Sequence, residues 1–121
     1  MNSSHPNDSI QQLTQRILAF RDARDWKPFH APKEMAVAIA AEAGELLQHF
    51  VWQSPEQSLQ RVQDRQPEIA AEMADIAILL LEMADIVGVN LGDAIASKLQ
   101  KNEARYPTDK ARGSNKKYNE L

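Results

Sequence analysis

The chain has 121 residues, of which 43% are apolar, and it contains 4 glycines and no cysteine. This length allows one domain with a hydrophobic core, and the lack of cysteine excludes disulfides, thiolate zinc sites and cysteine nucleophiles. The formal net charge of −3 is unevenly divided, because residues 98–121 carry 7 Lys and Arg against 3 Asp and Glu, whereas residues 1–97 carry 7 against 14.

The N-terminal part predicts a flexible polar segment, 1–8, followed by a helix over about 9–24. Apolar side chains recur there at helical spacing, at Ile10, Leu13, Ile17 and Phe20. An aromatic loop with two prolines follows, over 25–32. The start of the chain lacks the apolar stretch of a signal peptide, and the most hydrophobic run, 76–81, is too short to span a bilayer. We therefore expect a cytoplasmic protein.

The middle of the chain predicts two long helices with a short helix between them. Pro32 fits the first turn of a helix that should end near Gln53. Ser54 then begins the short helix. Pro67 opens a long helix to about residue 87, and Gly88 supplies its C-terminal stop.

The C-terminal part predicts one more helix and a tail. Asn90 caps a helix that should run to Tyr106, where Pro107 ends it. The pattern therefore predicts an all-α fold, with a four-helix domain over 9–107 in which the short helix is not counted. The basic tail, 108–121, has almost no apolar residues, so we expect it to be mobile alone or ordered by a partner.

Four carboxylates interrupt apolar, alanine-rich helical segments. Glu42 and Glu45 are three residues apart in one predicted helix, as are Glu72 and Asp75 in another. This spacing places each pair on one helix face, with side chains about 5–6 Å apart. If the helices pack side by side, four like charges converge and repel each other unless a cation neutralises them. Oxygen-only ligands favour a hard ion such as Mg²⁺.

The alternative is that these acids are surface residues of amphipathic helices, which one pair alone would favour. Two pairs on different helices favour a metal site. A second copy of the motif, Glu82 and Asp85, is rotated by roughly 80° from the first, so we expect it on an exposed or subunit-contacting face. A ferritin-like di-iron site is excluded, because no histidine follows a glutamate by three residues.

The two acidic pairs resemble the ExxE…ExxD signature of the MazG-like, all-alpha nucleoside triphosphate pyrophosphohydrolases. The resemblance extends over about 13–119, and it is strongest to the single-domain branch that includes dCTP pyrophosphatase. The further matching segments are the loop from Arg24 through Trp26 to Phe29 and His30, Trp52, the run 98–107 and the run 114–118.

This resemblance implies a MazG-like helical bundle that assembles as a dimer or a dimer of dimers. It also implies Mg²⁺-dependent hydrolysis of the bond between the α- and β-phosphates of nucleoside triphosphates, here dCTP or modified deoxynucleotides, in cleansing of the nucleotide pool. The implied metal ligands are Glu42, Glu45, Glu72 and Asp75. The implied phosphate-binding residues are Lys98, Asn102 and Arg105, with Lys101 a weaker candidate, and the implied walls of the base pocket are Trp26, His30 and Trp52.

The chemistry of these residue types agrees with the implied roles. Lys98, Asn102 and Arg105 recur along one face of the last helix, where cations could neutralise charge on phosphate oxygens. One carboxylate could orient the attacking water, and Glu45 is our candidate among four equivalent ones. The two tryptophans could stack on a base or could be core residues, and His30 could instead cap or pack the loop.

Two positions depart from the branch. A tyrosine that follows the ExxD motif by four residues there is Leu79 here, and a histidine of the first helix is replaced by Ile17. These differences concern base and sugar selectivity and leave the metal site intact. Two other functions fit parts of the sequence: a non-catalytic helical oligomer that serves as an interaction module, and nucleic-acid binding through the basic tail, which the acidic body disfavours.

Overall fold

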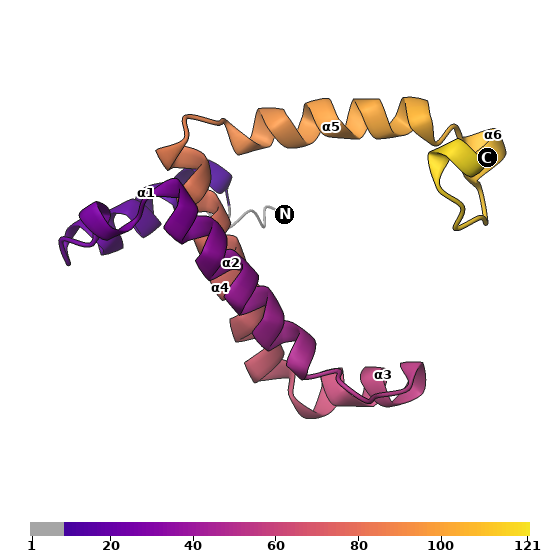
Figure 1. The fold of residues 1–121 in the computed structure, drawn as a ribbon, viewed down its shortest axis with the longest axis horizontal. Coiled ribbons are helices and arrows are strands. Elements are labelled where there is room, and N and C mark those ends of the chain that lie inside the picture. Colours follow the sequence, from indigo (N-terminus) through magenta and orange to yellow (C-terminus); the bar gives the residue numbers. More distant parts are fainter. Residues whose placement is uncertain (1–8) are drawn as a thin grey trace, which may run out of the picture. The chain divides into compact units, whose positions relative to one another are not determined.

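The computed structural model describes residues 9–121, so the predicted flexible segment 1–8 lies outside the described residues. Within that part the chain forms helices and turns without any strand, which confirms the predicted all-α class (Figure 1). The α-helices are α1 (Ile10–Asp22), α2 (Pro32–Gln48), α3 (Pro55–Asp64), α4 (Gln66–Ile86), α5 (Leu91–Arg105) and α6 (Thr108–Ala111), with single 3₁₀ turns at Lys27–Phe29 and Tyr118–Glu120.

The residues that start and stop the helices act as the sequence predicts. Ser9 accepts a hydrogen bond from the backbone N–H of Gln12, and Asn90 accepts one from that of Asp93, both at 3.0 Å. Ser54 and Gln57 form a reciprocal capping box at the start of α3. Gly88 follows α4 with a φ of 74°, in the left-handed region that glycine adopts without a steric penalty.

The end of α2 differs from the prediction. The helix ends at Gln48 and not near Gln53, because its hydrogen bonds tighten to i→i−3 spacing from His49 onward. Trp52 then takes a φ of 64°, a left-handed conformation that no helix continues through. The chain is thereby turned toward α3, and Trp52 stands on a turn and not on the helix.

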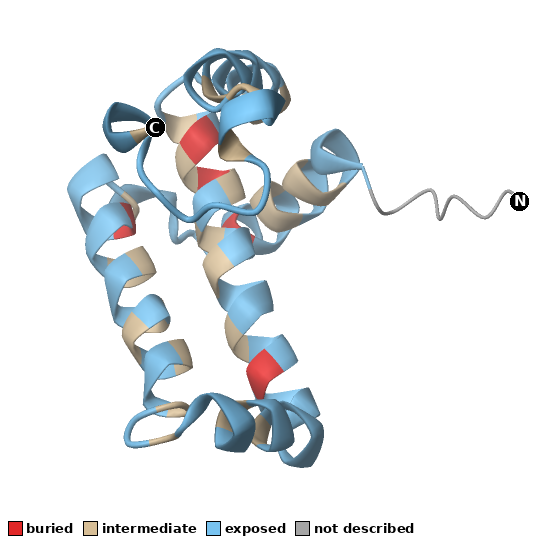
Figure 2. Cartoon of the chain, turned by 90° about the vertical axis from the view of Figure 1, so that its right-hand side faces the viewer, coloured by how far each residue is buried: buried red, intermediate tan, exposed pale blue. Residues whose placement is uncertain are grey.

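The chain divides into two compact units, 1–88 and 89–121. The predicted limits of the family domain, 9–107, and of the tail, 108–121, stay a prediction. In the first unit α2 and α4 lie side by side, and α1 and α3 also pack against α4 (Figure 1). The buried apolar side chains are Met35 on α2 and Ile69 and Ala84 on α4, all of them in this unit. Figure 2 colours the buried positions red.

The second unit contains α5, α6 and the last 3₁₀ turn. The guanidinium of Arg105 lies over the ring of Tyr118, 4.6 Å from its centroid, and the ring of Tyr106 meets Tyr118 edge-on at 6.2 Å. The sequence predicts a tail that is mobile alone or ordered by a partner. In the single chain the tail forms α6 and the last 3₁₀ turn, and the aromatic and cation–π contacts hold Tyr118 against the end of α5.

No helix among residues 9–121 combines the length and the apolar character needed to cross a membrane.

Candidate metal centre and nucleotide site

The packing of α2 against α4 brings the acidic side chains together. Glu42, Glu45 and Glu72 each offer one carboxylate oxygen, and these oxygens lie within 4.8 Å of one another. Asp75 lies outside this group, about one turn after Glu72 on α4. Its charge nevertheless contributes to raising the pKa of Glu42. The four residues are called the acidic cluster below. The structure therefore brings three of the predicted ligands together, and their role as ligands stays a prediction.

The acidic cluster lacks compensation by the protein. Glu42 Oε2 and Glu72 Oε2 are buried without a hydrogen-bond partner among the described residues. The pKa of Glu42 is raised to about 7, mainly by loss of solvent and further by the neighbouring carboxyl groups of Glu72, Glu45 and Asp75. Loss of solvent is also the main reason why the pKa of Glu72 is raised. Buried polar atoms without partners are costly and call for an explanation.

The residues present fit a divalent cation. The donors are all carboxylate oxygens, which favours a hard ion over zinc or copper. A cation would pair the two buried oxygens and would neutralise the repulsion that raises the pKa of Glu42. The acidic cluster is thus a candidate metal centre on geometric and electrostatic grounds.

The raised pKa values predict how the stability of the metal-free protein depends on pH. A carboxyl group whose pKa is raised by folding stabilises the folded state below its unfolded pKa of 4.5, and this stabilisation is lost as the pH rises through about 7. We therefore expect the thermal midpoint in a chelator to fall between about pH 5 and about pH 8, and Mg²⁺ to restore it at the upper end. Thermal unfolding followed by circular dichroism would measure this dependence.

The control for this prediction is Glu42→Gln, which removes the titrating group but keeps its size. In this variant the metal-free thermal midpoint should change less between about pH 5 and about pH 8 than in the wild type. Mg²⁺ should also raise the midpoint less than it does in the wild type. A variant with the same pH slope as the wild type would show that Glu42 does not carry the effect.

The acidic cluster borders a cavity of about 420 Å³ in the first unit. Its walls are formed by Glu45, Gln48 and His49 from the end of α2, Arg61 from α3, Arg65 between α3 and α4, and Glu72 from α4. Both arginines were missed by the sequence analysis. The sequence shows that they are four residues apart, but it does not indicate which face of the short helix packs beside the acidic residues.

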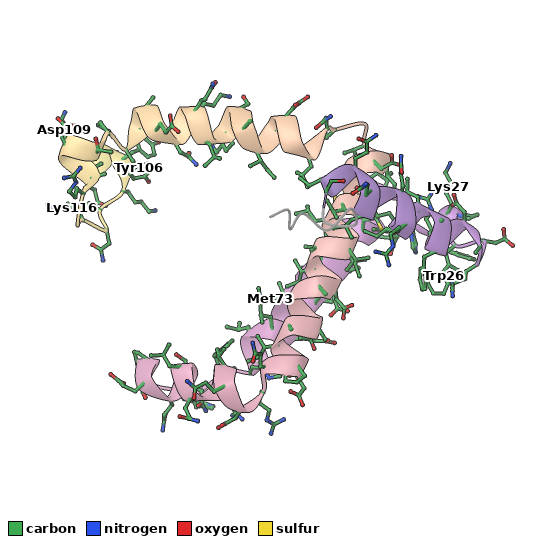
Figure 3. The ribbon with its side chains drawn as sticks, turned by 180° about the vertical axis from the view of Figure 1, so that it is seen from behind. Trp26, Lys27, Met73, Tyr106, Asp109 and Lys116 are labelled. Carbon is green, nitrogen blue, oxygen red and sulfur yellow. The ribbon has the colours of Figure 1, made fainter. Side chains whose placement is uncertain are left out.

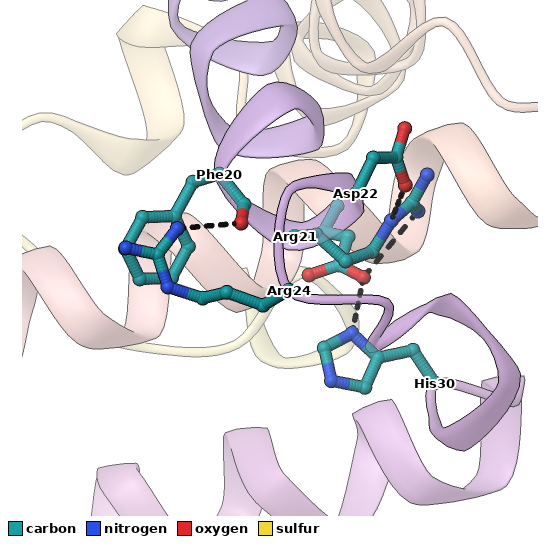
Figure 4. Close-up of polar contacts among 6 residues, drawn as sticks. Phe20, Arg21, Asp22, Arg24 and His30 are labelled. Carbon is teal, nitrogen blue, oxygen red and sulfur yellow. Dashed lines mark hydrogen bonds and ion pairs between the residues drawn. The ribbon is translucent and has the colours of Figure 1, made fainter.

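The predicted base-binding residues Trp26 and His30 lie on a loop that is fixed at several points. Asp25 adopts a φ of 54° at the turn, and the ring of Trp26 meets Phe20 edge-on at 5.7 Å and His30 at 6.3 Å. Arg24 covers the Phe20 ring at 3.7 Å and donates a hydrogen bond to the Phe20 carbonyl at 2.8 Å (Figure 4). The loop is therefore ordered, and its aromatic side chains are held in defined positions.

Glu82 corrects one prediction. The sequence predicts Glu82 and Asp85 on an exposed or subunit-contacting face, but only Asp85 is exposed, and Glu82 is buried with 3% of its surface accessible. Its carboxylate meets Nδ1 of His30 at 2.5 Å and the guanidinium of Arg21 at 3.5 Å (Figure 4). The face that carries Glu82 is covered by α1 and the aromatic loop, where opposite charge makes burial tolerable.

Both tryptophans are accessible in the single chain. Trp52 is 96% exposed and Trp26 is 43% exposed, so neither is a core residue of the described structure. Figure 3 shows Trp26 on the loop after α1. Large exposed aromatic rings are typical of surfaces that bind a ligand or another chain. Their role in base binding stays a prediction, as does that of His30.

The predicted phosphate-binding residues all lie on α5 in the second unit. Lys98 and Asn102 line one shallow groove with apolar neighbours, whereas Lys101 lies outside that groove. Arg105 is held against Tyr118 at the end of the helix. Three of the four side chains are exposed, and Asn102 is half-buried. Their role in phosphate binding stays a prediction.

A family model described as the MazG-like family matches residues 37–121, which is more than half of the chain and includes the acidic cluster and α5. The chain belongs to the MazG-like family. The predicted resemblance is confirmed, and the matched residues contain both acidic pairs of the ExxE…ExxD signature.

Individual relatives agree with this family. dCTP pyrophosphatase 1 of Rattus norvegicus is 33% identical over 121 residues, which cover 98% of this chain and 71% of that protein, and the Homo sapiens protein of the same name gives the same values. A crystal structure of a pyrophosphatase from Archaeoglobus fulgidus superposes with a TM-score of 0.79 at 34% identity, covering 88% of this chain and 98% of that one. The predicted fold and the predicted pyrophosphatase class of enzyme are confirmed by these relatives.

Proposed function

We propose that this MazG-like chain hydrolyses nucleoside triphosphates at the bond between the α- and β-phosphates, with Mg²⁺, to give a monophosphate and pyrophosphate. The observation that carries the proposal is the convergence of three carboxylate oxygens within 4.8 Å, together with two buried carboxylate oxygens that lack partners. The proposed substrates are dCTP or modified deoxynucleotides, because several relatives are dCTP pyrophosphatases. Cleansing of the nucleotide pool in the cytoplasm is the proposed role.

Each group of residues has a separate task in this proposal. Glu42, Glu45, Glu72 and Asp75 would hold Mg²⁺, which supplies positive charge against the phosphate oxygens when bound. Glu45 is exposed, so its carboxylate can accept a hydrogen bond from a water and orient it toward the α-phosphorus. Lys98, Asn102 and Arg105, with Lys101 as a weaker contributor, would neutralise charge on the phosphates.

A second copy of the chain is the proposed protein partner, in a dimer or a dimer of dimers. α4 carries apolar side chains around its whole circumference, which is typical of a helix that is buried on all sides. Met73, labelled in Figure 3, lies on α4 and is 58% exposed. The exposed large apolar residues of α2 and α4 are Val37, Leu47, Met73, Ile78 and Leu80. Association would remove these side chains from water, and the oligomeric state can be measured by light scattering.

The proposed reaction is tested with a panel of canonical and modified nucleoside triphosphates. Purified protein and Mg²⁺ are incubated with each, and products are separated by chromatography. We expect monophosphate and pyrophosphate without diphosphate or inorganic phosphate. The dCTP branch carries polar residues where this chain has Leu79 and Ile17, so the preferred base can differ from cytosine. The relative turnover of nucleotides with different bases is therefore the most informative result. Absence of turnover with every nucleotide, with or without Mg²⁺, would exclude the proposed reaction.

Trp26 is expected to contribute to nucleotide affinity. Stacking of a base on an aromatic side chain is worth about 1–3 kcal/mol by alanine substitution, so Trp26→Ala should raise KM about fivefold or more. The midpoint of Mg²⁺ activation should not change, because the loop carries no carboxylate of the acidic cluster. Steady-state kinetics with varied nucleotide and varied Mg²⁺ would separate the two effects.

The matched control is Trp26→Phe, which keeps an aromatic ring beside Phe20 and should retain most of the nucleotide affinity. If Trp26→Ala binds nucleotide as tightly as the wild type, Trp26 serves only to pack the loop against α1.

A further inference from the structure

The cavity beside the acidic cluster contains opposite charges that do not neutralise each other. Glu45 and Glu72 line it together with Arg61 and Arg65. Among residues 9–121 the ion pairs involve only Arg21, His30 and Lys33 as cations, so neither cavity arginine has a carboxylate partner. Because the carboxylates and the guanidinium groups of this cavity do not pair with each other, the carboxylates can bind a cation and the guanidinium groups can bind an anion.

The two guanidinium groups are also free of their nearest acidic neighbour in sequence. Asp64 accepts a hydrogen bond from the Gln60 side chain at 3.0 Å and forms no ion pair with Arg61 or Arg65. Arg61 and Arg65 are four residues apart, and the N–H of Arg65 bonds to the carbonyl of Arg61 at 2.9 Å, so both lie on one side of the chain. Like charges at this spacing repel by a few tenths of a kcal/mol unless an anion lies between them.

The lining of the cavity decides what kind of anion it accepts. All six lining side chains, Glu45, Gln48, His49, Arg61, Arg65 and Glu72, are polar or charged. A nucleobase is bound preferentially by apolar and aromatic walls, whereas phosphate groups are bound by arginine forks and amide donors. A volume of about 420 Å³ is large enough for two phosphate groups with a hydrated cation beside them.

We propose that Arg61 and Arg65 bind the β- and γ-phosphates of the substrate, and hence the pyrophosphate that leaves, from the same protomer that supplies the acidic cluster. This inference rests on the proposed function and adds a phosphate subsite on α3 to the residues on α5. The pyrophosphate half of a triphosphate carries most of its negative charge, and an ion held by Glu45 and Glu72 would share oxygens with the phosphates that the arginines hold.

The test is direct binding of pyrophosphate, measured by titration calorimetry in the presence of Mg²⁺. Arg61→Gln and Arg65→Gln should each weaken pyrophosphate binding about tenfold or more, because each removes charged hydrogen bonds to phosphate. Arg61→Lys keeps the positive charge but loses the planar guanidinium group. Its affinity for pyrophosphate should therefore lie between that of the wild type and that of Arg61→Gln. The matched control, Arg16→Gln on α1, removes an arginine outside this cavity and should change binding less than twofold.

A second titration uses a nucleoside monophosphate, the other product of the proposed reaction. Its affinity should be unchanged in the Arg61 and Arg65 variants. Circular dichroism would show whether the variants are folded. If a glutamine variant does not fold, pyrophosphate binding is measured with the lysine variant of that position.

The outcomes separate this inference from the proposed reaction. Unchanged pyrophosphate binding in both variants would overturn the subsite, even if the wild type hydrolyses triphosphates. Equal weakening of monophosphate and pyrophosphate would overturn the assignment to the leaving group. If the wild type turns over no triphosphate but binds pyrophosphate through these arginines, the reaction is wrong and the subsite stands. A wild type that binds no pyrophosphate would overturn the subsite.

Discussion

Glu45→Gln and Asp75→Asn are each expected to lower turnover at least a hundredfold, with the helices intact. Loss of one carboxylate removes a proposed ligand of the divalent ion, and a hundredfold loss corresponds to about 2.7 kcal/mol of transition-state stabilisation. The charges of Glu45 and Asp75 help to raise the pKa of Glu42, so removing either relieves repulsion in the metal-free protein. The thermal midpoint in a chelator should therefore stay the same or rise while activity disappears. Pyrophosphate release and thermal unfolding would be measured on the same samples.

The chain provides a matched control for these variants in its second acidic motif. Asp85 lies ten residues after Asp75 on the same helix and is exposed, so Asp85→Asn changes charge and composition in the same way without touching the acidic cluster. This variant should keep wild-type turnover and wild-type stabilisation by Mg²⁺. Wild-type activity in Glu45→Gln or Asp75→Asn would remove that residue from the ligand set. A parallel loss of helicity would instead assign the residue a role in folding.

The parts of the fold that local residues decide were predictable from the sequence. Asn90 caps the helix that it is predicted to cap, Ser9 and Ser54 cap helices at the predicted starts, and Gly88 ends α4 in a left-handed conformation. Local signals suffice there because a cap acts on backbone groups within one turn. The end of α2 was misplaced for a related reason, because apolar spacing continued through Phe50 although the hydrogen-bond pattern had already changed.

The candidate site depended on contacts between distant segments, and these were predicted only in part. The convergence of Glu42, Glu45 and Glu72 follows from a single assumption, that the two most apolar helices pack side by side. The burial of Glu82 required knowledge of its partners, which are 61 and 52 residues away in the chain. One signal was available, because Arg21 follows Ile17 by four residues and so continues the apolar stripe of α1. A charged residue on a buried face implies a partner of opposite charge.

Glu82→Gln is expected to lower the free energy of unfolding by about 3 kcal/mol, the lower end of the range for breaking a buried ion pair. The variant leaves Arg21, 4% exposed, without one of its two carboxylate partners. Asp22 still bonds to the guanidinium at 2.9 Å and is the main cause that raises the pKa of Arg21 against burial, so the loss is partial. Urea unfolding at fixed protein concentration would measure the change, and Asp85→Asn on the exposed side of α4 should change stability by less than about 0.5 kcal/mol.

The double variant Arg21→Met with Glu82→Leu distinguishes stability from positioning of the aromatic loop. Replacing both charges by apolar side chains avoids an unpaired buried ion, so most of the stability should return. His30 nevertheless loses the carboxylate that holds its ring, and Trp26 packs against that ring at 6.3 Å. In a Trp52→Phe background the fluorescence of Trp26 should then shift to longer wavelength, and KM should rise while the Mg²⁺ midpoint stays unchanged. Recovery of stability together with wild-type fluorescence and KM would show that Glu82 balances charge in the core and does not position the loop.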